Sequence, residues 1–162
     1  MDFERNVGGK MLLQIKKLRT WYNVNMIHKS SESLILLTYK EKILLMIRDY
    51  VFNSGLKKIW RMIGGKKEGN ESFEKTITRK IKEEMNIEIS DVKLLLISPS
   101  DEKGTHFYHG KLTDNNVNRI QRAEGQELQF FDLKELDKLQ LAASANLFFT
   151  RHRGQIEELL VN

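Results

Sequence analysis

Residues 64–87, GGKKEGNESFEKTITRKIKEEMNI, place a glycine pair and a polar loop in front of a segment with the periodicity of a helix. Apolar residues in that segment recur every four positions, as one buried helix face requires: Phe73, Ile77 and Ile81. Ser72 can cap the start, and Asn86 can adopt the left-handed conformation that ends a helix. We therefore predict a helix from about residue 72 to 85.

The polar face of this helix carries the chemistry. Residues three and four apart are neighbours on a helix, so Lys80, Glu83 and Glu84 share one face. Carboxylates there would suit a hard cation such as Mg²⁺, which could bridge them to the oxygens of a diphosphate. Mixed charges on a helix are also typical of a solvated face with weak ion pairs. The preceding glycine pair and polar loop favour the first interpretation.

The same stretch resembles the Nudix box, in which a glycine, a glutamate, an Arg-Glu pair, a Glu-Glu pair and a final glycine follow at fixed spacing. The matching positions are Gly65, Glu71, Arg79, Ile81, Glu83, Glu84 and Ile87. Two positions depart, because Lys80 replaces a glutamate and Asn86 replaces a glycine. The resemblance implies the Nudix fold, an α/β/α sandwich with a mixed β-sheet, and metal-assisted attack of water on a nucleoside diphosphate linked to another group.

The resemblance also implies roles for individual residues. Its catalytic set would be Glu83, Glu84, Arg79 and Glu71, with Arg79 pairing with Glu71 and positioning a glutamate. Its metal ligands would be the Gly65 carbonyl, Glu83, Glu84 and Glu124. Glu124 falls on the EGQ sequence that supplies a ligand in MutT-type members; the alternative is an acid on a surface loop. The expected cofactor is Mg²⁺, with Mn²⁺ as the alternative.

Three residues are predicted to bind substrate: Trp60, Lys66 and Asn146. Asn146, in AASANLFF, falls where MutT-type members place an asparagine against the nucleobase, and an amide can both donate and accept hydrogen bonds. Asparagine is equally suited to cap a helix, and one is expected from about residue 144 to 160. Trp60 could stack on a base, but an aromatic residue before the glycine pair is more often part of the core.

Of the two departures from the Nudix box, Lys80 is the one expected to affect metal binding. An ammonium about 4 Å from a divalent ion would be repelled by roughly 8 kcal/mol at an effective dielectric of 20. Lys80 could swing out to solvent, leaving a weakened metal site. It could replace one metal by pairing with Glu83 or Glu84, so that a diphosphate binds but is poorly hydrolysed. Alternatively, another acid, such as Glu74 or Glu127, could supply the missing group.

The predicted function is therefore that of a nucleotide pyrophosphohydrolase, a Nudix hydrolase cleaving a nucleoside triphosphate or another nucleoside diphosphate derivative, with activity that Lys80 could reduce. The alternative is a catalytically degenerate Nudix domain that binds a nucleotide or an RNA 5′ end as a regulatory or binding module.

The flanking sequence predicts the rest of an α/β domain. Two aliphatic runs around Lys40-Glu41 have the pattern of a hairpin buried on at least one face, and Asp132 to Glu135 has capping-box spacing before a short helical turn. The segments expected to be extended are 33–39, 42–50, 59–65, 92–99, 105–112 and the end of 124–131. Strands and helices mixed in one short chain imply an α/β sandwich.

Composition sets wider bounds. The chain has 162 residues, no cysteine and one proline, and we predict a single domain over 1–162 in which the role of 1–30 is open. The absence of an apolar run long enough for a signal peptide or a membrane span predicts a cytoplasmic protein without a membrane partner. A net charge of +5 favours anionic partners, a nucleotide first and RNA with weaker support. We expect a monomer or a homodimer.

Overall fold

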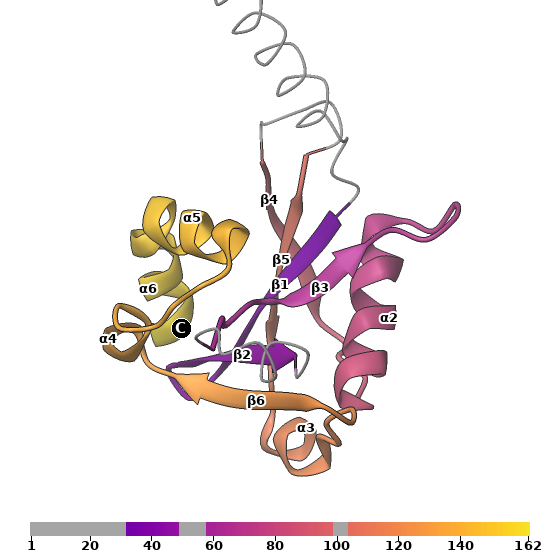
Figure 1. Cartoon of the computed structure of the whole chain (residues 1–162), viewed down its shortest axis with the longest axis horizontal. Helices are drawn as coiled ribbons and strands as arrows, with labels where there is room; N and C mark the ends of the chain where they lie inside the picture. Colours follow the sequence, from indigo (N-terminus) through magenta and orange to yellow (C-terminus); the bar gives the residue numbers. More distant parts are fainter. Residues whose placement is uncertain (1–31, 49–57, 99–103) are drawn as a thin grey trace, which may run out of the picture.

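The computed structural model describes residues 32–48, 58–98 and 104–162, so the N-terminal segment 1–30 lies outside the described residues. A six-stranded mixed sheet lies between α2 on one face and α4, α5 and α6 on the other (Figure 1). The strands are β1 (Glu32–Tyr39), β2 (Lys42–Arg48), β3 (Ile63–Lys66), β4 (Val92–Ile97), β5 (His106–Lys111) and β6 (Gln126–Phe131). The helices are α2 (Phe73–Met85), α3 (Asp114–Arg119), α4 (Leu133–Leu136), α5 (Ala143–Arg151) and α6 (Arg153–Val161). The predicted α/β/α sandwich is confirmed.

Strand β1 organises the sheet, whose order is β4-β5-β1-β2-β6. It pairs in parallel with β5 and antiparallel with both β2 and β3. The pairs with β2 involve the end of β1, whereas the pairs with β3 involve its start, with Glu32 opposite Lys66. This arrangement brings the glycine pair of β3 against the first half of β1, beside α2.

The predicted hairpin between β1 and β2 is confirmed. Its turn is Lys40-Glu41, and both residues have positive φ values of 46° and 61°. Two consecutive left-handed residues form the tight turn whose twist matches that of the flanking strands.

The alternation of side chains divides the core into two layers. Leu34 and Leu36 of β1 pack toward the C-terminal helices, whereas Ile35 and Leu37 pack toward α2. A strand buried on both faces reads as an unbroken aliphatic run, which is what the sequence has in β1 and β2.

Helix α2 begins and ends at the capping residues predicted for it. The Ser72 side chain accepts a hydrogen bond from the Lys75 backbone N–H at 3.1 Å. Asn86 has φ 53°, and its backbone N–H donates to the Lys82 carbonyl at 2.9 Å. The Asn86 amide also donates to Gln121 Oε1 at 2.8 Å, a contact that glycine could not make. Asn86 therefore replaces the family's glycine without changing the end of the helix.

The C-terminal region differs from the prediction of one helix. The chain forms α5 and α6, which are divided at His152, where φ is −116° and ψ is 23°. Phe148 and Phe149 of α5 and Ile156 of α6 all enter the same core layer. The predicted helical turn after Asp132 is confirmed as α4, with both capping-box hydrogen bonds present. Among the described helices, none is long and apolar enough to span a membrane.

Candidate functional site

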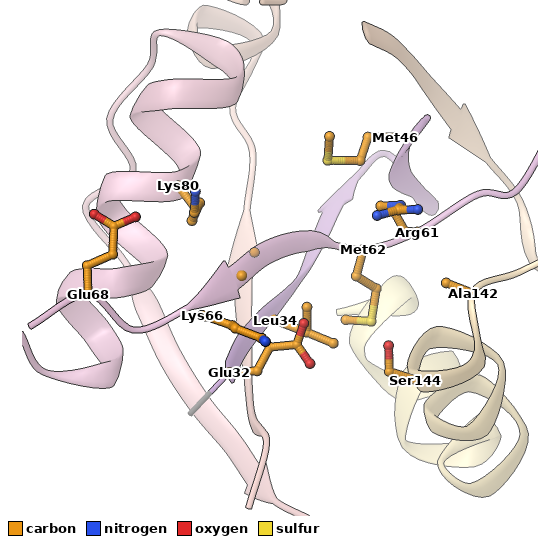
Figure 2. A pocket seen from close by; sticks show the side chains of 12 residues that line it. Glu32, Leu34, Met46, Arg61, Met62, Lys66, Glu68, Lys80, Ala142 and Ser144 are labelled. Carbon is orange, nitrogen blue, oxygen red and sulfur yellow. The ribbon is translucent and has the colours of Figure 1, made fainter. Parts of the chain in front are cut away.

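A cavity of about 370 Å³ lies where β1, β3, α2 and the start of α5 meet (Figure 2). Its floor includes Gly64 and Gly65. Five charged side chains line it, three basic and two acidic: Arg61, Lys66, Lys80, Glu32 and Glu68. The lining therefore carries a net positive charge when all five groups are ionised.

The glycine pair makes the close approach of three elements possible. Gly64 has φ +145°, and a Cβ atom there would lie 2.1 Å from the Ser33 carbonyl oxygen of β1. A Cβ atom on Gly65 would lie 3.0 Å from Cε of Lys80. The missing side chains therefore let β3 pack against β1 and let the Lys80 side chain of α2 lie against β3.

Arg79 joins the loop before α2 to the helix itself. Its Nη2 atom lies 2.6 Å from Glu71 Oε1, and its Nε atom donates to Glu71 Oε2 at 3.1 Å. Its Nη1 atom contacts Glu83 Oε1 at 2.9 Å and Glu68 Oε1 at 3.2 Å. The predicted pair of Arg79 with Glu71 is thus present, and its role in catalysis stays a prediction.

Arg79 also controls the protonation of Glu71. Hydrogen bonds from Arg79, then from the Glu68 backbone and the Thr76 hydroxyl, lower the pKa of Glu71 from 4.5 to about 2, while burial opposes them. Because the folded protein holds the lowered pKa, the stabilisation is complete above pH 4.5 and is lost as pH falls toward 2.

We expect Glu71→Gln to lower the melting temperature by a few degrees at neutral pH and by much less near pH 2. The loss of the charged partner of Arg79 is the cause. Thermal unfolding of parent and variant across this pH range measures the effect. Glu88→Gln is the matched control, because Glu88 is exposed and its ion pair with Lys82 is long, at 3.7 Å. A melting difference that stays constant with pH would contradict the role of the Glu71 charge.

Lys80 pairs with Glu83, which is the contact that the second of the three alternatives requires. Its ammonium lies 2.8 Å from Glu83 Oε2, and its side chain is 17% exposed. Lys80 therefore does not extend into solvent. The Lys80 hydrogen bond lowers the pKa of Glu83, with Arg79 acting in the same direction and burial opposing both.

Glu84 lies in a different environment from Glu83. It is buried, at 4% exposed, and accepts a hydrogen bond from the Gln126 amide at the start of β6. The loop before β6 contacts the end of α2, where the Gln121 N–H donates to the Met85 carbonyl at 2.9 Å. Glu124 is exposed in that loop. Neither Glu84 nor Glu124 is among the residues that line the cavity.

The predicted metal ligands do not fit a magnesium ion in this arrangement. Arg79 contacts one carboxylate oxygen of Glu83 and Lys80 contacts the other. Within 32–48, 58–98 and 104–162, no group of three or more His, Cys, Asp or Glu residues could hold a metal ion. The acids suggested as replacements lie elsewhere, since Glu127 pairs with Lys58 at 2.9 Å and Glu74 is exposed in the first turn of α2.

The predicted substrate-binding residues are distributed unevenly. Lys66 lines the cavity. Trp60 belongs to the core, at 6% exposed, as the core interpretation predicted. Its ring forms a T-shaped pair with that of Phe131, with the ring centroids 4.7 Å apart. Asn146 does not cap α5, whose N-cap is Ala142; it is exposed in the first turn and is not among the cavity residues.

Sequence reasoning did not single out Arg61, Glu32 or Ser144 as cavity residues. Burial raises the pKa of Glu32, and the nearby Lys66 and Arg61 act in the opposite direction. The signal for Arg61 was present in the sequence, because a charged residue interrupts the apolar run IWRMI. Glu32 starts β1 and Ser144 lies in α5, both far from β3 in the sequence. Neither residue interrupts an apolar run in the way that Arg61 does.

The fold and this glycine-floored cavity together define a Nudix-type domain. A family model described as the NUDIX domain matches residues 28–151. The chain belongs to the NUDIX domain family. No curated protein matches it.

Solved structures agree with this assignment at the level of the fold. One described as MutT from Aliivibrio salmonicida and Vibrio cholerae matches with TM-score 0.62 and 17% identity over 76% of this chain and 96% of its own. A MutT NUDIX hydrolase from Burkholderia pseudomallei matches with TM-score 0.55 and 19% identity over 72% and 92%. The NUDIX domain of Shewanella oneidensis NrtR, complexed with ADP ribose, matches with TM-score 0.58 and 18% identity over 85% and 97%.

Proposed function

We propose that this Nudix domain binds a nucleoside diphosphate compound in the cavity and hydrolyses it slowly. The observation that carries the proposal is the Lys80 ammonium, which occupies the helix face where the family has a carboxylate and pairs with Glu83. A cation at this position favours binding of a phosphate anion and disfavours binding of a divalent metal.

The charge of the cavity supports binding of an anion. Lys66 and Arg61 add to Lys80, and the glycine pair exposes backbone at the floor. A diphosphate is a compact anion that several basic groups can contact at once. The cavity volume of about 370 Å³ lies in the range of small-molecule sites.

The environment of the two box glutamates supports slow turnover. Both oxygens of Glu83 are hydrogen-bonded to cationic side chains, and Glu84 is buried against Gln126. Glu83, held in this way, is a weak base for a water molecule, because its negative charge is already stabilised.

A binding module without turnover is the second candidate function. The same pairing of Lys80 with Glu83 favours it. The NUDIX domain of Shewanella oneidensis NrtR is complexed with ADP ribose, which is a nucleoside diphosphate linked to another group. ADP-ribose is therefore a suitable first ligand for this chain as well.

A panel assay separates the two functions. Pure protein is incubated with Mg²⁺ or Mn²⁺ and with nucleoside triphosphates, ADP-ribose and other nucleoside diphosphate derivatives, and released phosphate or nucleotide is measured beside binding. We expect measurable binding and turnover well below about 1 s⁻¹, the lower end of ordinary enzyme rates. Binding without product supports the module, and ordinary rates or failure to bind any compound would refute slow hydrolysis.

RNA binding stays a weaker expectation, resting on the net charge of +5. Its measurement is the dependence of RNA affinity on salt concentration, which is steep when several phosphates are contacted. A shallow slope would remove RNA 5′ ends from the candidates.

A further inference from the structure

Arg61 has a hydrogen-bond donor that nothing in the described structure satisfies. Its Nε atom is buried and has no partner among the described residues. Its backbone is held by two hydrogen bonds with Met46, because the Arg61 N–H donates to the Met46 carbonyl and the Met46 N–H donates to the Arg61 carbonyl, each at 3.0 Å. A buried donor without a partner costs free energy, and Arg61 also lines the cavity.

Lys80 is another basic residue of this cavity, and contacts with Glu83 and Gly65 hold its side chain in place. Its ammonium contacts Glu83 Oε2 at 2.8 Å, and its stem lies against Gly65. Figure 2 shows Lys80 on α2 and Arg61 at the opposite end of the cavity, on the segment that leads into β3. The two cations therefore belong to different walls of the cavity, over a floor that carries no side chains at Gly64 and Gly65.

Resting on the proposed function, we propose that Arg61 and Lys80 bind the diphosphate group directly, so that nucleotide binding needs no divalent cation. The planar guanidinium of Arg61 can donate two hydrogen bonds to one phosphoryl group. The ammonium of Lys80 supplies a positive charge on the side where the family's pattern would place metal-binding carboxylates. The two acids of the cavity, Glu32 and Glu68, are outnumbered by Arg61, Lys66 and Lys80.

Metal dependence of binding is the first test. The full chain is titrated calorimetrically with ADP-ribose, once with excess EDTA and once with Mg²⁺, and pyrophosphate is added as a competitor. We expect dissociation constants that agree within about threefold, and displacement by pyrophosphate. Binding that appears only with Mg²⁺ overturns this inference and leaves the proposed function intact. Failure to bind under both conditions overturns both.

Two variants test the residues. We expect Arg61→Gln and Lys80→Gln each to weaken ADP-ribose binding in EDTA by about tenfold or more. Arg119→Gln and Lys82→Gln are the matched controls, because both residues are exposed and neither lines the cavity. Parent-like affinity of either cavity variant overturns the inference.

Folding of Arg61→Gln is checked by thermal unfolding, because this side chain is half-buried. If it fails to fold, Arg61→Lys and Lys80→Gln decide. Arg61→Lys keeps the charge and loses the planar fork, so we expect affinity between those of parent and Lys80→Gln. Parent-like affinity of either Arg61→Lys or Lys80→Gln overturns the inference.

Discussion

Replacement of Lys80 by glutamate is expected to raise magnesium-dependent hydrolysis of a nucleoside diphosphate compound by about 100-fold in kcat/KM. The substitution removes the ammonium that pairs with Glu83 and adds a carboxylate on the same helix face. Two acids three residues apart repel each other without a metal and bind it together. The variant should also gain thermal stability on addition of Mg²⁺, which the parent should not.

Steady-state hydrolysis of ADP-ribose and nucleoside triphosphates measures this gain. Lys80→Gln separates its causes, since it removes the cation and adds no carboxylate. Lys82→Glu is the control for added negative charge, because Lys82 is exposed on α2. An active parent that Lys80→Glu leaves unchanged would show that Lys80 does not limit the chemistry.

Replacement of Gly64 by alanine is expected to destabilise the fold by about 4 kcal/mol. An alanine Cβ would lie 2.1 Å from the Ser33 carbonyl oxygen, and the φ of +145° is unfavourable for any L-residue with a side chain. Relief of the clash requires β3 to move away from β1, which would disturb the pairing of Leu34 with Gly64 and the floor of the cavity.

Chemical denaturation of the two proteins measures the loss. Gly154→Ala is the matched control, since nothing lies within 4 Å of a Cβ atom there and the residue is in α6. We expect that control to be neutral or more stable by about 0.5–1 kcal/mol. Equal stability of Gly64→Ala and parent would mean that the close approach of β3 to β1 is not required.

Helix α2 and the β1–β2 hairpin could be predicted residue by residue because their signals are local. Ser72 caps the helix, Asn86 ends it and Lys40-Glu41 form the turn through contacts within a few positions of each residue. The Nudix fold was also within reach of the sequence, because the box places its residues at fixed spacing along one loop and one helix.

The C-terminal helices show where local signals end. The apolar residues from 147 to 160 fit one long helix as well as two short ones. The division at His152 depends on Phe148, Phe149 and Ile156 all reaching the same core layer, which is a matter of packing against the sheet. The burial of Trp60 against Phe131 depends on the same layer.

For this protein, the sequence alone determined the family and the helix that carries the box, since both depend on short spacings. The ion pair of Arg79 with Glu71 was expected from the resemblance to that family. Tertiary structure decided the character of the site. Arg61, Lys80 and Ser144 are far apart along the chain and line one cavity only after β3 pairs with β1 and α5 packs beside it. Gly65 has no side chain, so the stem of Lys80 lies against β3 while its ammonium pairs with Glu83.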